Sequence, residues 1–198
     1  MYEHDPWLLG FCAFNYSPEL ASIFAMLKRD CQIDAAVETG TFQGSTTTLL
    51  SLLFNEVHTI EIMGDVYATV SPRLNKLPNV HCHLGSSEQV LENLLPTMSD
   101  KRLFFYLDAH WQEFWPLRDE LEQISKTHKD NCIIVIDDFQ VPGRNDIAYD
   151  SYGIHECSYT YIKDKLDKVF TQYDFYYLIP KMPYCRAKFI ALPKHWNR

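Results

Sequence analysis

The sequence lacks an excess of positive charge and lacks any long apolar run. Its 198 residues hold 18 Lys and Arg against 26 Asp and Glu, which gives a formal net charge of -8 at pH 7. Coating nucleic acid requires a basic face, so we expect no nucleic-acid partner. A membrane-spanning helix needs about 18 consecutive apolar residues, and no stretch approaches that length, so we expect no membrane partner.

Paired cysteines and a secretion signal are missing as well. The six cysteines form no CxxC pair and no regular spacing, and the start "MYEHDPWLLGFCAF" lacks the basic residues and long apolar core of a signal peptide. We therefore expect reduced thiols and a cytoplasmic location. The length suits one domain over residues 1–198, with residues 1–33 as an N-terminal helical cover.

Short apolar runs alternate with segments of helical periodicity along most of the chain. A capped helix is expected from Ser17, where Pro18 suits a first turn. The alternation predicts a parallel sheet with helices on both faces. The predicted strands are Ala35–Glu38, Val57–Ile62, Val80–Leu84, Leu103–Leu107 and Ile133–Ile136, and the predicted helices between them are Ser45–Phe54, Asp65–Leu74, Ser87–Leu95 and Pro116–Thr127.

The C-terminal part departs from this alternation. After a helix around Tyr159–Tyr173, the runs "FYYLIP" and "RAKFIALP" are joined only by "KMPYC". That connection is too short for a crossover helix, so the two runs should pair antiparallel. The expected fold class is α/β, with a mostly parallel seven-stranded sheet that ends in an antiparallel hairpin.

The loop "VETGTFQGSTT" joins the first predicted strand to a helix start. It lacks the lysine of a phosphate-binding P-loop and the GxGxxG of a dinucleotide fingerprint. It resembles the E/D-x-G-x-G-x-G loop of class I S-adenosylmethionine-dependent O-methyltransferases, with Phe42 at the middle glycine position. The branch around macrocin O-methyltransferase and the cephalosporin hydroxylase-like proteins is the most similar. A tight strand-to-helix turn without a ligand would use the same glycines.

This resemblance implies a site for S-adenosylmethionine. Glu38 would lie near the amino group of the methionine part, and the loop would line the ligand with Thr39, Gly40, Thr41, Gly44 and Ser45. Glu61, at the end of the second strand, is placed to accept hydrogen bonds from the ribose hydroxyls, as in dinucleotide enzymes. Gly85 and Ser86 match the adenine-side turn of the family.

Two smaller patterns have structural interpretations. Ser86 and Gln89 also fit a helix capping box. His81 and His83 share one strand face, which suggests a metal, but neither lies at the carboxyl end of its strand. We interpret both as structural histidines.

Three aspartates close the fourth and fifth strands. Asp108 follows "RLFFYL", and Asp137 and Asp138 follow "NCIIVI". Adjacent parallel strands bring these carboxylates together, and a hard divalent cation would relieve their repulsion. The family has "LDGD" and "DDY" here, with aspartates that bind Mg²⁺, which implies Asp108, Asp137 and Asp138 as metal ligands. Caps and solvated strand ends are the alternative.

His110 stands where the family motif has its second aspartate, a candidate general base. An imidazole with a pKa near neutral can accept the proton of an acceptor hydroxyl, so Asp108 and His110 are the predicted catalytic residues. A helix-start or aromatic-packed histidine beside Trp111 is the alternative.

The stretch 140–161 is the longest irregular segment, and it directly follows the Asp pair. Arg144, Tyr149, Tyr152 and His155 are candidates for contact with a polar acceptor, although a plain surface loop is an equal alternative.

Taken together, the resemblance implies a Mg²⁺-dependent O-methyltransferase that acts on a small hydroxylated acceptor such as a sugar, a glycosylated metabolite or a polyphenol. A homo-oligomer is possible. The rivals are a metal-dependent glycosyltransferase, because "DAH" resembles a DxH motif, and a non-catalytic S-adenosyl-binding protein.

Overall fold

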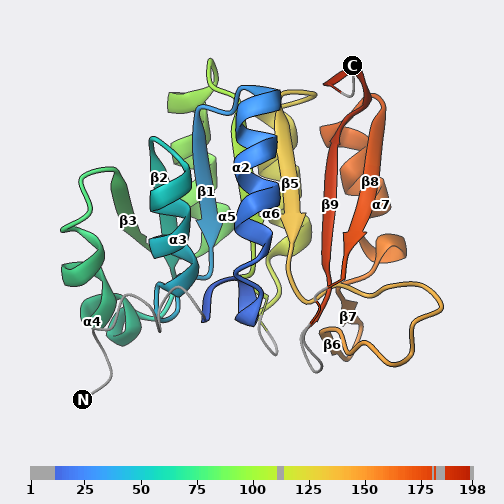
Figure 1. The fold of residues 1–198 in the computed structure, drawn as a ribbon, viewed down its shortest axis with the longest axis horizontal. Helices are drawn as coiled ribbons and strands as arrows, with labels where there is room; N and C mark the ends of the chain where they lie inside the picture. Colours follow the sequence, from blue (N-terminus) through green and yellow to red (C-terminus); the bar gives the residue numbers. More distant parts are fainter. Residues whose placement is uncertain (1–11, 111–113, 180, 182–185, 197–198) are drawn as a thin grey trace.

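The computed structural model describes residues 12–110, 114–179, 181 and 186–196. Within them, one sheet of seven strands has the order β3-β2-β1-β4-β5-β9-β8 (Figure 1). Its strands are β1 (Ala35–Thr39), β2 (Val57–Glu61), β3 (Val80–Leu84), β4 (Leu103–Leu107), β5 (Cys132–Ile136), β8 (Tyr173–Leu178) and β9 (Lys188–Pro193).

The sheet confirms the predicted fold class. Strands β1 to β5 pair in parallel, whereas β9 pairs antiparallel with both β5 and β8. Strand order reverses between β1 and β4, which lie side by side. In open α/β sheets ligands bind beyond the carboxyl ends of the strands at such a reversal.

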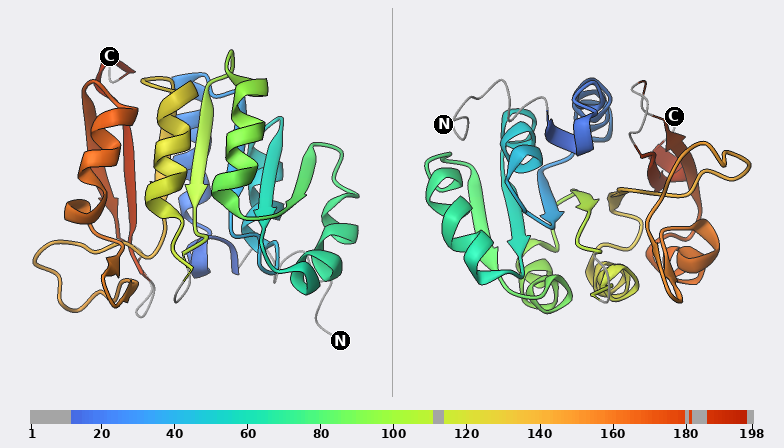
Figure 2. Two further views of the ribbon diagram at one scale, coloured as in Figure 1. Left: turned by 180° about the vertical axis from the view of Figure 1, so that it is seen from behind. Right: turned by 90° about the horizontal axis from the view of Figure 1, so that it is seen from below.

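Helices cover both faces of the sheet. They are α2 (Leu20–Cys31), α3 (Ser45–Leu53), α4 (Gly64–Leu74), α5 (Ser87–Leu94), α6 (Leu117–Thr127) and α7 (Tyr159–Val169), with short 3₁₀ turns η1 (Leu95–Met98) and η2 (Lys194–Trp196). One buried cluster joins the sheet to α5, α6 and α7, and a second joins the opposite face to α2, α3 and α4. Figure 2 shows the two helical layers from behind and from below.

Strand β4, "LFFYL", shows how the sequence builds these layers. Every residue is fully buried, and alternate side chains point to opposite faces of the sheet. Leu103, Phe105 and Leu107 join one cluster, and Phe104 and Tyr106 join the other. Burial of such side chains stabilises the fold by about 1.5–3 kcal/mol each. A central parallel strand is therefore apolar throughout.

Several predicted boundaries and one predicted cap were wrong. The helix expected to start at Ser17 is α2, which begins three residues later, at Leu20. Strand β2 ends at Glu61, one residue earlier than predicted. Ser86 occupies the N-cap position of α5, but its hydroxyl contacts the Glu88 carboxylate instead of a backbone N–H of the helix. The predicted capping box with Gln89 is therefore not formed.

The stretch 140–161 is more ordered than predicted. It holds a small hairpin of β6 (Ser151–Tyr152) and β7 (His155–Glu156), and α7 begins at Tyr159. The Ser158 hydroxyl caps this helix by accepting from the Tyr161 N–H at 3.2 Å. The hairpin lies at the end of the sheet where the parallel strands terminate (Figure 1).

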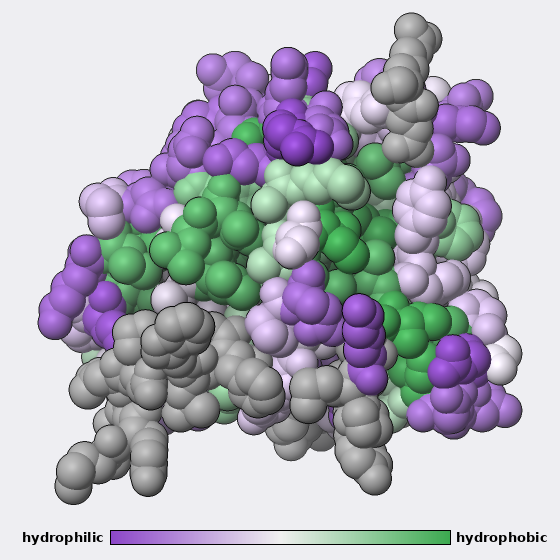
Figure 3. Space-filling model, viewed as in Figure 1, coloured by the Kyte–Doolittle hydropathy of each residue, from purple (hydrophilic) through white to green (hydrophobic). Residues whose placement is uncertain are grey.

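The N-terminal cover is described from residue 12, and residues 12–16 form one helical turn ahead of α2. No helix in the described part of the chain is long and apolar enough to cross a membrane. The five described cysteines are free thiols. On the face seen in Figure 3, apolar side chains cross the middle of the molecule below a hydrophilic upper rim.

Candidate active site

The glycine loop packs its backbone against the end of β4. Gly40 has φ +85°, and a Cβ built there would overlap the carbonyl oxygen of Asp108. Asp108 in turn donates its N–H to the Thr39 carbonyl at 3.1 Å. Only glycine allows this approach together with this φ value. The predicted cofactor loop and the predicted catalytic carboxyl residue are thus direct neighbours.

The loop then turns into α3 without a side-chain cap. Gly44 is the N-cap residue, with φ +69°, and Ser45 is the first residue of the helix. Phe42, at the middle position of the family motif, also has a positive φ of 45° and leaves its side chain 66% exposed. The family's glycine at this position has a physical reason, since a non-glycine residue pays steric strain in this conformation.

Glu61 holds the loop from the end of β2. One carboxylate oxygen accepts the N–H of Phe42 at 2.8 Å, and the other accepts the N–H of Met63 at 2.9 Å. Each oxygen keeps a second lone pair for another donor. The carboxylate is therefore tied to the predicted cofactor loop and retains the capacity that a ribose diol requires.

Glu38 is buried beneath the loop. Its carboxyl accepts from the hydroxyls of Thr47 in α3 and Thr59 in β2, the latter at 2.6 Å. Burial raises the pKa of Glu38 to about 7, and the two hydroxyls and the nearby Glu61 modify that shift. Thr41 adds a hydroxyl contact to Thr59 at 2.6 Å. Glu38 thus stabilises the loop from below, and its contact with the methionine part of a cofactor stays a prediction.

Gly85 and Ser86 line a groove beside β3. The Gly85 N–H donates to the Glu61 carbonyl at 2.9 Å, which fixes this turn to the end of β2. The groove has a volume of about 410 Å³ and extends along α5 as far as Thr97. The structure therefore brings the predicted adenine-side turn next to the predicted ribose carboxylate.

Asp137 is engaged on both carboxylate oxygens. Oδ1 lies 2.6 Å from Lys188 Nζ and accepts the Asp138 N–H at 2.7 Å. Oδ2 accepts from the Tyr106 hydroxyl and from Asn15 Nδ2, the latter at 3.0 Å. Two oxygens offer about four acceptor positions, and all are taken. In this arrangement a buried lysine, rather than a metal, balances the Asp137 charge.

Asp138 and Asp108 remain more available. Asp138 lies 3.0 Å from Arg186 Nη1, and the same guanidinium contacts Asp150. Burial, followed by repulsion from Asp137 and Asp138, raises the pKa of Asp108 well above its usual range. One ligand atom each of Asp108, His110 and Asp138 lies within 4.8 Å of the others, a geometry that can hold a metal ion.

His110 is buried, and neither ring nitrogen has a hydrogen-bond partner among the described residues. Burial lowers its pKa to about 4, so the imidazole is neutral at pH 7. A buried polar group without a partner costs free energy. The packing of His110 is aromatic, as the alternative interpretation held, but against Trp115 at 5.1 Å between ring centroids; Trp111 lies outside the described residues.

The predicted acceptor residues divide into two groups. Tyr152 and His155 pack against Trp115, with ring centroids 5.6 and 5.7 Å away, and so join the aromatic wall next to His110. Arg144 and Tyr149 instead line a separate hollow of about 590 Å³ within residues 140–151. Arg144 is engaged there with Asp146. The structure therefore brings only Tyr152 and His155 toward His110.

The partners of the aspartates were not predicted from the sequence. Asn15, Tyr106, Arg186 and Lys188 contact Asp137 or Asp138. Trp115 was not predicted either, and its buried indole N–H has no partner that the structure describes. One signal was available: Lys188 lies inside the otherwise apolar run "AKFIALP" and is fully buried in β9. A buried lysine requires an anionic partner.

Comparisons with known proteins support the methyltransferase resemblance. The model of the Nodulation protein S (NodS) family matches residues 1–93. No curated protein matches the sequence with significance.

Solved structures match over most of the chain. The O-methyltransferase TomG from Streptomyces achromogenes, in complex with SAM, has a TM-score of 0.60 at 16% identity over 89% of this chain and 80% of its own. A putative caffeoyl-CoA O-methyltransferase from Staphylococcus aureus gives 0.59 at 14% identity over 95% and 91%. The SAH-bound methyltransferase PaMTH1 from Podospora anserina gives 0.56 at 16% identity over 89% and 78%.

The chain has the Rossmann-like fold of the class I methyltransferases, as predicted from its sequence. At these identities the matched structures establish the fold. The roles of individual residues depend on the geometry described above.

Proposed function

We propose that the protein is an S-adenosylmethionine-dependent O-methyltransferase that acts on a hydroxyl group of a small acceptor. One observation carries the proposal: the backbone of the glycine loop packs against Asp108, next to His110, whose ring nitrogens have no partner in the described part of the chain. A methyl donor bound along the loop and Glu61 would face these two side chains. Holding the acceptor oxygen in line with the sulfonium methyl is the main requirement of the reaction.

The surroundings of the loop suit an adenosine. Glu61 supplies acceptor positions for ribose hydroxyls, and large apolar side chains are exposed nearby at Phe42, Ile62, Met63 and Leu84. A flat, partly apolar base binds well to such a surface. Two of the matched structures have SAM or SAH bound, which favours this cofactor over a sugar nucleotide.

Asp108, His110 and Asp138 form the acceptor side of the proposed site. Their donor set fits a divalent cation, because one imidazole nitrogen of His110 and one carboxylate oxygen each of Asp108 and Asp138 lie within 4.8 Å of one another. A bound cation would lower the pKa of the acceptor hydroxyl. Mg²⁺ prefers oxygen ligands, whereas Mn²⁺ also accepts an imidazole, so the proposed metal set points to Mn²⁺ as well as Mg²⁺.

The chain's own residues orient the acceptor. The Trp115 indole N–H and the His110 ring nitrogens are buried without partners among residues 12–110, 114–179, 181 and 186–196, so a hydroxylated ligand can satisfy them. Asp108, whose backbone contacts the cofactor loop, and His110 beside it are the candidate groups to accept the hydroxyl proton. Tyr152 and His155 extend this wall with aromatic surface.

Calorimetry tests the cofactor part of the proposal. S-adenosylhomocysteine should bind the folded protein, and sugar nucleotides should not. Binding of a sugar nucleotide without S-adenosylhomocysteine would instead favour the glycosyltransferase alternative. Binding of S-adenosylhomocysteine without methyl transfer to any of a broad set of acceptors would favour the non-catalytic alternative.

A metal series with one variant tests the acceptor side. Methyl transfer should fall with a chelator and recover with Mn²⁺ at least as well as with Mg²⁺. His110→Asp restores an all-oxygen donor set and should shift the preference toward Mg²⁺. An unchanged metal preference in His110→Asp would show that His110 is not a metal ligand. Methyl-transfer rates that do not change with the chelator would show that the reaction needs no metal.

A further inference from the structure

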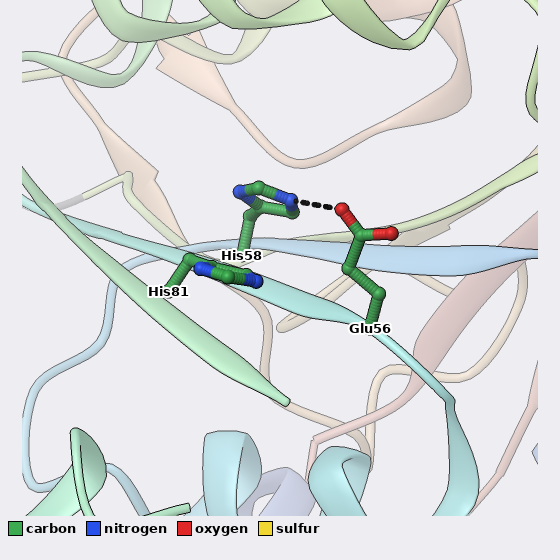
Figure 4. Close-up of side chains that lie close together, drawn as sticks. All are labelled: Glu56, His58 and His81. Carbon is green, nitrogen blue, oxygen red and sulfur yellow. Dashed lines mark hydrogen bonds and ion pairs between the residues drawn. The ribbon is translucent and has the colours of Figure 1, made fainter. Parts of the chain in front are cut away.

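A second group of metal-type side chains lies at the opposite end of strands β2 and β3 from the proposed active site. Glu56 precedes β2, His58 lies within it, and His81 lies in β3. The parallel register places His58 directly beside His81. Because side chains alternate along a strand, His81 and His83 also share one face. Figure 4 shows Glu56, His58 and His81 turned toward one another.

The geometry of this group suits one metal ion. One ligand atom from each of Glu56, His58 and His81 lies within 4.8 Å of the others. Ligands at about 2.0–2.2 Å from a tetrahedral zinc ion stand roughly 3.4 Å apart, so a small contraction suffices. His81 is exposed and can rotate, whereas His58 is buried at 7% exposure. A fixed ligand and an adjustable one together allow the site to close.

Neighbouring groups already orient these ligands. Lys101 Nζ holds one oxygen of Glu56 at 2.5 Å, and His58 Nε2 lies 3.0 Å from the other oxygen. On its far side, His58 Nδ1 lies 2.9 Å from His83 Nε2. Protein metal sites use such outer hydrogen bonds to fix the tautomer and direction of a ligating imidazole.

Ring stacking also holds these imidazoles together. The ring planes of His58 stack on those of His81 and His83 at 24° and 18°. Neutral imidazoles have the lone pairs that a metal requires.

We propose that Glu56, His58 and His81 form a Zn²⁺ site, with His83 and Lys101 as outer residues that orient the ligands. Three protein ligands leave a fourth position for water, which fits the exposure of His81. β3 ends the seven-stranded sheet and pairs only with β2 among the described strands. The ion joins this edge strand to its neighbour, so the site stabilises the edge of the sheet.

The experiment must separate this site from the acceptor-side group. Full-length, tag-free protein carrying His110→Ala is therefore the common background, because that change removes the imidazole from the other candidate group. Into this background His81→Ala is introduced, with His195→Ala as the matched control. His195 is an exposed histidine in η2, far along the chain from the cluster.

Calorimetry with Zn²⁺ and thermal unfolding with and without Zn²⁺ are the measurements. The background protein and its His195→Ala form should bind one Zn²⁺ and gain thermal stability, and His81→Ala should lower the affinity at least tenfold and lose the gain. Co²⁺ should give visible absorption bands that disappear with His81→Ala. Zn²⁺ binding that is absent from the background, or equal in the His81→Ala and His195→Ala forms, overturns the proposal.

Discussion

The two halves of the proposed active site satisfy their carboxylates in opposite ways. At the ends of β1 and β2, Glu38 and Glu61 receive only neutral donors, threonine hydroxyls and backbone N–H groups. At the end of β5, Asp137 and Asp138 are paired with the cations Lys188 and Arg186. The first half is built from neighbouring loops, and the second depends on the C-terminal hairpin.

This difference shows which interactions hold each half of the site in place. Burial raises the pKa of Glu38 to about 7, although its threonine donors favour the charged form, so this carboxyl takes up a proton near neutral pH. A buried ion pair fixes both of its side chains, and removal of either partner costs several kcal/mol. The acceptor half should therefore respond strongly to the loss of a cation.

The largest effect should follow removal of the buried cation. Lys188→Met leaves the fully buried Asp137 without its cation, so the free energy of unfolding should fall by about 3–5 kcal/mol. Urea denaturation measures the change. Adding Asp137→Asn to Lys188→Met should recover much of the loss, because no buried charge then remains unpaired.

An exposed lysine provides the matched control. Lys163 pairs with Asp167 at 2.5 Å, with both side chains about half exposed. Lys163→Met should cost less than about 1 kcal/mol. Equal losses for Lys188→Met and Lys163→Met would show that the acceptor half is not held by its buried ion pair.

The next effect concerns the backbone contact between the two halves. Gly40→Ala places a Cβ onto the Asp108 carbonyl and forces alanine into φ +85°. Left-handed conformation costs about 1–2 kcal/mol and overpacking about 1–3 kcal/mol, so a loss near 3 kcal/mol is expected. S-adenosylhomocysteine affinity should fall with it, as calorimetry can measure.

Gly143→Ala separates the two causes. Gly143 has a similar φ of +77°, but nothing lies within 4 Å of a Cβ built there. This variant should lose only the conformational part, about 1–2 kcal/mol, and keep full affinity. Matching losses in both variants would mean that the contact with Asp108 contributes nothing.

Much of the cofactor half was predictable because its signals are local. Glu38, Gly40, Gly44 and Glu61 lie within 24 positions of one another, in the order that a strand–loop–helix–strand unit requires. The structure confirms that these residues meet at the ends of β1 and β2. Turn chemistry and strand order are sufficient for such a prediction.

The acceptor half was harder to predict because its partners are remote. Asn15 contacts Asp137 across 122 positions, and Arg186 contacts Asp138 across 48. No sequence periodicity links such distant residues. From the sequence, a metal ion was therefore the one charge expected to relieve the repulsion among the aspartates. His110 was singled out correctly as a residue of this cluster, while its role and the metal stay predictions.

A pH series tests the protonation of Glu38 in the folded protein. The pKa of Glu38 is raised from 4.5 to about 7, so its stabilising contribution is present below pH 4.5 and is lost as the pH rises to 7. The glutamine of Glu38→Gln does not titrate. As the pH rises from 5 to 7, the free energy of unfolding of this variant should therefore increase relative to that of the wild type, by up to about 3 kcal/mol. Urea denaturation at several pH values measures the difference.

Glu122 supplies the control for that series. Hydrogen bonds from Lys165 and Lys168 lower its pKa to about 2, so Glu122→Gln should differ from wild type by a constant amount between pH 5 and 8. If Glu38→Gln gave the same flat difference, Glu38 would be ionised in the folded protein between pH 5 and 8, like Glu122.

The smallest effect concerns the departure of the cofactor loop from its family pattern. Phe42 is held at φ +45° with its ring 66% exposed. Phe42→Gly relieves about 1–2 kcal/mol of steric strain and adds about 0.5–1 kcal/mol of chain entropy to the unfolded state, so stability should rise by up to about 1 kcal/mol. Phe42→Ala keeps the strain and should not share the gain.

Because the hydrogen bond from residue 42 to Glu61 uses the backbone N–H, both variants should still bind S-adenosylhomocysteine. Differential scanning calorimetry and titration give the two readouts. A Phe42→Gly protein no more stable than Phe42→Ala would mean that the loop is relaxed, and that neutral backbone bonds alone suffice to hold this half of the site.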